Sequence, residues 1–208
     1  MLPNHRVRIA LIVALFCVMF LSGCTQHEVA EDIVTSPNPS SSLEEAVRML
    51  QYGSYPLTDV ILLFEQSKQE AITESSYAEA EQVIANAWRG IGYAQFLKGE
   101  FGLAEEALEA ALEYRVTPTP ILYNLLGIIA MKQTNFSLAV ERFTEGLQLP
   151  SIEQSEYQLT KQEMMFNLIV CYERLLDWQA ARDAASSYLE LFPDDEVVRR
   201  EYEFLITR

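Results

Sequence analysis

Apolar residues from position 43 to the C-terminus recur at spacings of three and four, with polar and charged residues between them. This period is typical of amphipathic helices, and no stretch alternates in the way a strand does. Ser41 and Ser42 followed by Glu44 and Glu45 indicate the start of the first helix, because serine caps helices and acids favour their first turn. The pattern predicts an all-α domain over residues 43–208.

Three segments of this domain can be aligned with one another, at about residues 85–118, 120–153 and 162–195. The first two share a glycine, Gly92 and Gly127, nine residues before an aromatic residue, and each segment closes on or near a proline. Small residues at such positions let two helices approach closely. Each segment has an aromatic residue at the expected turn, followed three residues later by alanine: Phe101 and Ala104, Phe136 and Ala139, Trp178 and Ala181.

These features resemble tetratricopeptide repeats (TPRs), which are antiparallel helix pairs of 34 residues. The turn aromatics lie 35 and then 42 residues apart, so extra residues are expected around 151–161, and the third segment has Ile169 in place of the glycine. The resemblance implies a TPR-like superhelix of antiparallel helix pairs, closed by a C-terminal capping helix that begins near Asp194 or Asp195. Residues 43–75 match the pattern poorly, and whether they form a true repeat stays open.

The N-terminus has the order of a secretory signal: Arg6 and Arg8, then an apolar run from Ile9 to Leu21, then small residues. The apolar run forms about 20 Å of helix, shorter than the roughly 30 Å hydrocarbon core of a bilayer. Leu21-Ser22-Gly23-Cys24 resembles the lipobox of bacterial lipoproteins. The resemblance implies that residues 1–23 are a signal peptide and that Cys24 carries a lipid anchor.

Residues 24–42 are polar and rich in serine and proline, which predicts a lipidated N-terminus followed by a flexible tether. The tether would have a root-mean-square reach of about 25 Å. The domain would therefore face outside the cytoplasm, lipid-anchored to the cell membrane or the outer membrane. Thr25 is not the aspartate that retains lipoproteins at the inner membrane, which favours the outer membrane in a cell with two membranes.

The net charge and the small number of histidines and cysteines disfavour several functions. Lys and Arg number 15 against 30 Asp and Glu, a net charge of −15 that opposes binding to nucleic acid. Both histidines, His5 and His27, precede the helical domain, so no His-based catalysis, metal site or cofactor is expected, and we interpret the protein as not an enzyme. Cys171 is the one cysteine expected in the domain, and a buried apolar role is favoured over a reactive thiol.

Carboxylates are plentiful in residues 103–113, so a pair of catalytic acids is not refuted by counting them. Their helical spacing favours a solvated face opposite Leu108, Ala111 and Leu112. The four acids on that face are Glu105, Glu106, Glu109 and Glu113.

In TPR proteins the first helix of each pair lines a concave groove that holds an extended peptide or a partner helix. The resemblance thus implies a peptide- or protein-binding groove, although the family's basic clamp for a peptide carboxylate is not reproduced here. For each residue, packing between helices is the open alternative. By register the groove set is Asn86, Arg89, Tyr93, Phe96, Asn124, Ile128, Met131, Lys132, Phe166 and Arg174, with Leu97, Val170 and Glu173 on the same faces.

The combined prediction is a lipoprotein scaffold that binds a segment of an envelope protein, in the assembly of an envelope complex. The alternative is an accessory lipoprotein that binds a small ligand, or senses one, between the third repeat and residues 151–161.

Overall fold

The computed structural model describes Ile33 and residues 41–53, 55–74 and 76–208. The predicted signal peptide, Cys24 and most of the predicted tether lie outside these residues. Within them the chain forms α-helices, two short 3₁₀ helices and no strand. None of the helices described is long and apolar enough to be a membrane span.

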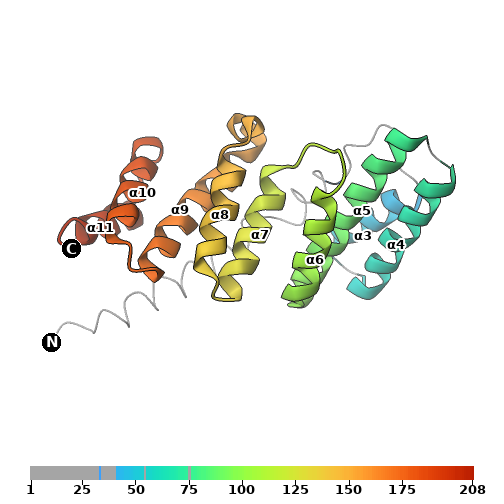
Figure 1. Cartoon of the computed structure of the whole chain (residues 1–208), viewed down its shortest axis with the longest axis horizontal. Helices are drawn as coiled ribbons and strands as arrows, with labels where there is room; N and C mark the ends of the chain where they lie inside the picture. The colour runs from blue at the N-terminus through green and yellow to red at the C-terminus, as the bar shows by residue number, and fades with distance from the viewer. Residues whose placement is uncertain (1–32, 34–40, 54, 75) are drawn as a thin grey trace.

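From residue 41 onward, the described α-helices form four consecutive pairs and a final single helix. Neighbouring pairs stack along the long axis of the molecule, from α4 at one end to α11 at the other (Figure 1). The pairs are α3 (Ser41–Tyr52) with α4 (Leu57–Glu74), α5 (Tyr77–Lys98) with α6 (Phe101–Leu112), α7 (Pro120–Lys132) with α8 (Phe136–Leu147), and α9 (Gln158–Arg174) with α10 (Trp178–Leu191); α11 spans Glu196–Leu205. The predicted fold class, an all-α TPR-like superhelix of helix pairs with a capping helix, is confirmed.

The turn inside each of the last three pairs has the same construction. One residue with positive φ, namely Gly99, Thr134 or Leu176, follows the first helix. The next residue caps the second helix, and the side chains of Asn135 and Asp177 accept hydrogen bonds from backbone N–H groups at 3.3 and 3.1 Å. Because the left-handed residue reverses the chain and the cap starts a new helix, the aromatic residue is placed at the first position of α6, α8 and α10.

Close approach of the paired helices explains the two repeated glycines. A Cβ atom added at Gly92 would lie 2.6 Å from Leu108 Cγ, and one added at Gly127 would overlap the ring of Phe143. Leu108 and Phe143 are themselves fully buried, so neither has space to move away.

The extra residues before the third repeat are divided between a longer linker and a longer first helix, since α9 has 17 residues and α7 has 13. The linker contains η1 (Pro150–Glu153) and η2 (Ser155–Tyr157). Ile152 of η1 is buried in an apolar cluster with Phe143 and Met164, so this insertion packs against the repeats. The N-terminal segment that matched the repeat pattern poorly also forms a helix pair. Phe64 of α4 fills the space beside Gly90 of α5 and is fully buried.

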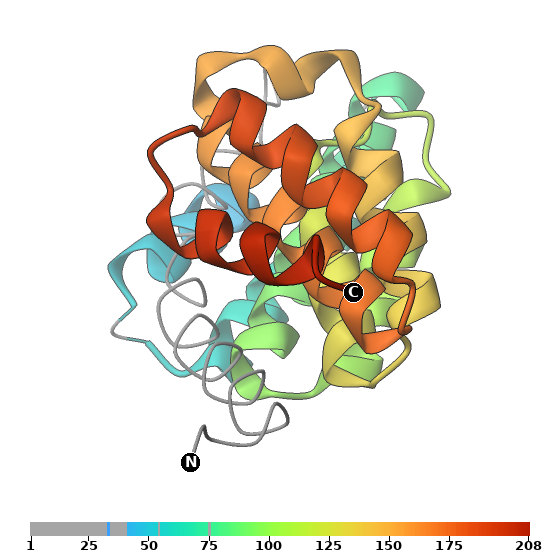
Figure 2. The ribbon, with the colours of Figure 1, turned by 90° about the vertical axis from the view of Figure 1, so that its left-hand side faces the viewer.

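Hydrogen bonds to Asp195, the N-cap residue, hold the start of the capping helix α11 in place. Asp195 accepts hydrogen bonds from the backbone N–H groups of Val197 and Val198 at 3.0 and 3.1 Å. The Tyr188 hydroxyl of α10 donates to Asp195 at 2.7 Å and accepts from Gln162 of α9 at 2.8 Å. Polar contacts thus join the last three helices, and α11 lies across the end of the array (Figure 2).

Candidate protein-binding surface

The first helices α5, α7 and α9 lie side by side, because each contacts the next. The structure places the predicted groove residues on these helices at three levels of exposure. Asn86, Arg89, Tyr93, Asn124 and Phe166 are buried; Phe96, Ile128 and Met131 are half-buried; and Lys132 and Arg174 are exposed. Ligand contact by any of these residues stays a prediction.

Arg89 connects α5 to the segment that leads into α7. One guanidinium nitrogen donates to the carbonyl of Thr117 at 2.9 Å, and the other donates weakly to the Asn86 side chain at 3.4 Å. Asn86 also accepts from Gln82 at 3.3 Å. Asn86 and Arg89 are almost fully buried, and Arg89 bonds to the segment between two repeats. In this structure the two side chains therefore stabilise the junction between those repeats.

Asn124 makes the corresponding connection between α7 and α9. Its amide donates to the Glu163 carboxylate at 2.7 Å, and both side chains are buried. A hydrogen bond satisfies both of these buried polar groups, so this contact stabilises the stacking of the third pair on the second. The sequence interpretation missed Glu163, although it occupies the position of α9 that Asn86 occupies in α5 when the turn aromatics are aligned.

The accessible part of the predicted set gathers in the C-terminal halves of the first helices. We call it the exposed row, and it mixes apolar and basic groups. The Phe96 ring is supported by Tyr93 and Phe101, with centroids 6.5 and 5.9 Å away. The Arg174 guanidinium lies 5.8 Å from the centre of the Phe136 ring. The exposed row consists of Phe96, Leu97, Ile128, Met131, Lys132 and Arg174.

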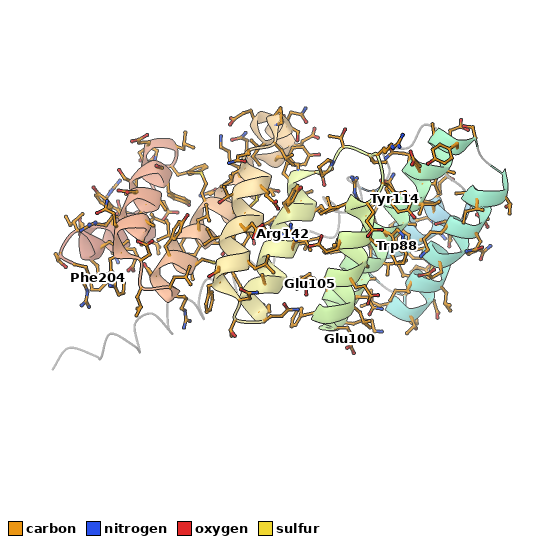
Figure 3. The ribbon with its side chains drawn as sticks, viewed as in Figure 1. Trp88, Glu100, Glu105, Tyr114, Arg142 and Phe204 are labelled. Carbon is orange, nitrogen blue, oxygen red and sulfur yellow. The ribbon has the colours of Figure 1, made fainter. Side chains whose placement is uncertain are left out.

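The acids of α6 do not all form a solvated face as expected. Glu105 accepts a hydrogen bond from Gln133 at the end of α7, and Glu109 forms an ion pair with Arg142 of α8. Partial burial raises the pKa of Glu109, and the nearby Arg142 opposes that shift. Glu105 and Arg142 both lie where α6 meets the α7–α8 pair (Figure 3), so these side chains help join two repeats. The expectation holds for Glu106 and Glu113, which are exposed.

Besides Glu163, two further titratable groups of α9 are buried. Burial raises the pKa of the Cys171 thiol to about 12, so the thiol is neutral and fills space, as the sequence suggested. Burial also raises the pKa of Glu173 to about 8, and the neighbouring Glu201 of α11 adds to the shift. Across residues 41–53, 55–74 and 76–208, no three His, Cys, Asp or Glu side chains come together as a metal site would need.

Comparison with known proteins shows a structural likeness but no family. No family model matches the chain, and no curated protein sequence matches it. A similar chain occurs in the crystal structure of the APC/C hetero-tetramer Cut9–Hcn1, with 19% identity and a TM-score of 0.46. The match covers 89% of this chain and 40% of that chain, so the protein spans about two fifths of its neighbour's length. The fold assignment therefore rests on the helix pairs themselves.

Proposed function

We propose that the protein is an extracytoplasmic lipoprotein, anchored through Cys24, whose helical repeats bind a segment of an envelope protein. It acts as a scaffold in the assembly of an envelope complex and catalyses no reaction. The observation that carries this proposal is the exposed row, which runs across three adjacent first helices instead of being confined to one. A surface shared by successive repeats suits an extended peptide or a helix.

The chemistry of the exposed row indicates the kind of segment it would bind. Phe96, Leu97, Ile128 and Met131 offer apolar contact area, and Met131 adapts to irregular shapes. Lys132 and Arg174 are exposed cations in a chain of net charge −15. A partner segment with large apolar residues and at least one carboxylate would satisfy both features.

The proposal is tested by capture from the detergent-solubilised envelope of the source organism. The bait is the full chain, and the test variant carries Met131→Glu with Lys132→Glu, which places two acids in the exposed row. The matched control is Leu103→Glu, because Leu103 is an exposed leucine on α6. We expect one partner to be retained by the wild type and the control and to be lost from the double variant.

Direct contact is then checked by photo-crosslinking from position 128 to the captured protein. Capture of the same proteins by all three baits would contradict the proposed surface. A thermal-shift screen with small metabolites distinguishes the alternative function. If capture is unspecific and one metabolite raises the Tm, the scaffold proposal is wrong.

A further inference from the structure

Ile33 does not behave as a residue of a free tether. It lies eight residues before the start of α3 at Ser41, inside the stretch expected to be flexible, yet its backbone is helical. Its side chain is 0% exposed. An isoleucine in a solvated linker would keep most of its surface in water, so Ile33 must be covered by other parts of the chain.

The surroundings of Ile33 belong to the N-terminal half of the molecule. It is a member of the apolar cluster formed by α3 to α7, which includes Leu43, Phe64, Ile91 and Leu122. The two other clusters are built from α7 to α11 and do not contain it. Eight residue steps between Ile33 and Ser41 can span up to about 27 Å, which is enough to reach this half of the array.

The sequence between Ile33 and α3 disfavours a simple extension of that helix. Pro37 and Pro39 lie in this stretch. Proline lacks a backbone N–H and restricts the preceding residue to extended conformations, so one unbroken helix from Ile33 through α3 is not expected. Ile33 is therefore a separate point of attachment.

We propose that Ile33 docks the segment ahead of α3 onto the apolar core of the N-terminal repeats, so that the occupant of this site is the chain's own linker. The docking does not depend on the function proposed above. Its consequence rests on lipidation at Cys24. The free tether would then run only from Cys24 to Ile33, and its reach would fall from about 25 Å to about 17 Å. The docked segment holds the domain closer to its anchor than the length of the linker implies.

The test compares two isoleucines in the full chain, purified in mild detergent. Ile33→Ala removes the proposed anchor, whereas Ile72→Ala makes the same change at a residue of α4 that is 62% exposed. We expect Ile33→Ala to lower the Tm by about 5–10 °C and Ile72→Ala to change it by less than about 2 °C. Ile33→Val removes only one methylene group from the buried side chain, so it should lower the Tm by a smaller amount, about 1–4 °C.

Hydrogen exchange provides a local readout independent of global stability. Amides around residue 33 should be protected in the wild type and in Ile72→Ala, and should exchange at the rate of an unfolded peptide in Ile33→Ala. If these amides exchange freely in the wild type, and Ile33→Ala melts like Ile72→Ala, the docking proposal is wrong. A Cys24→Ala variant should keep the same protection around Ile33 even if it loses membrane attachment, because the docking does not depend on the lipid. Loss of this protection in Cys24→Ala would contradict docking through Ile33.

Discussion

At the scale of single residues, the glycines of this domain fall into two physical classes. Gly127 faces the buried Phe143 ring with no room for a methyl group, whereas a Cβ at Gly102 would meet nothing within 4 Å. Both lie in helices, where alanine is intrinsically favoured over glycine. The same substitution should therefore have opposite effects at the two sites.

We expect Gly127→Ala to destabilise the protein by about 1–3 kcal/mol, because the helices of the pair must separate or Phe143 must leave its rotamer. Gly102→Ala should stabilise it by about 0.5 kcal/mol through helix propensity. Urea unfolding followed by circular dichroism measures both changes. Equal effects of the two substitutions would show that Gly127 is not a close-packing position.

Leu176 has a left-handed backbone conformation that suits glycine better than leucine. It has φ of 60° in the turn between α9 and α10, and its side chain is 67% exposed. The equivalent position in the first turn is Gly99, with φ of 79°. A left-handed conformation costs an ordinary L-residue roughly 1–2 kcal/mol, and an exposed leucine recovers little of that by packing.

Leu176→Gly should therefore stabilise the protein by about 0.5–1 kcal/mol, measured as a shift in the urea midpoint. Leu175→Gly is the control, since Leu175 has φ of −79° and glycine gains nothing there. That control should destabilise by about 1 kcal/mol. A destabilising Leu176→Gly would mean that the leucine side chain makes contacts worth more than the strain.

At the scale of helices, the junction of α9 with the capping helix contains a buried acid. Glu173 is buried with its pKa raised to about 8, first by burial and then by Glu201. An unfolded glutamate has a pKa near 4.5. Between these values the folded state binds more protons than the unfolded state, so the contribution of Glu173 to stability falls as pH rises through this window and is lost above about pH 8.

Glu173→Gln keeps the shape and removes the charge. We expect the variant to be more stable than the wild type at pH 8.5, by about 1–3 kcal/mol, and to lose less stability between pH 5 and 8.5. Urea unfolding across that pH range measures the difference. Glu190→Gln is the control because Glu190 is exposed on the neighbouring α10. Parallel pH profiles for Glu173→Gln and the wild type would contradict the buried acid.

The helices also show what a single sequence can and cannot predict. The turn aromatics and glycines located the helix pairs, because their positions follow from close packing within each pair. The pattern did not distinguish polar residues that face water from those that face a neighbouring repeat. Arg89, Asn124 and Glu163 are buried between repeats. The pattern could not show this, because their contacts join residues that are far apart in the sequence. Ile33 escaped notice for the same reason, since one apolar residue has no period.

At the scale of the whole molecule, the proposed position of the domain depends on one sulfur atom. Cys24 is expected to carry the lipid, whereas Cys17 lies in the predicted signal and Cys171 is buried in α9. The proposed membrane attachment therefore depends on acyl chains carried by Cys24.

Cys24→Ala should therefore move the helical domain from the membrane fraction to the soluble fraction or leave it as an unprocessed precursor. Cys17→Ala is the matched control, since it changes a cysteine in the same N-terminal region without removing the proposed acyl acceptor. Fractionation with immunoblotting reports the location, and mass spectrometry of the N-terminal peptide reports the lipid. If the processed Cys24→Ala protein still sediments with membranes, attachment comes from a surface of the domain or from its partner. The exposed row would then be the first surface to examine, because it combines apolar residues with Lys132 and Arg174.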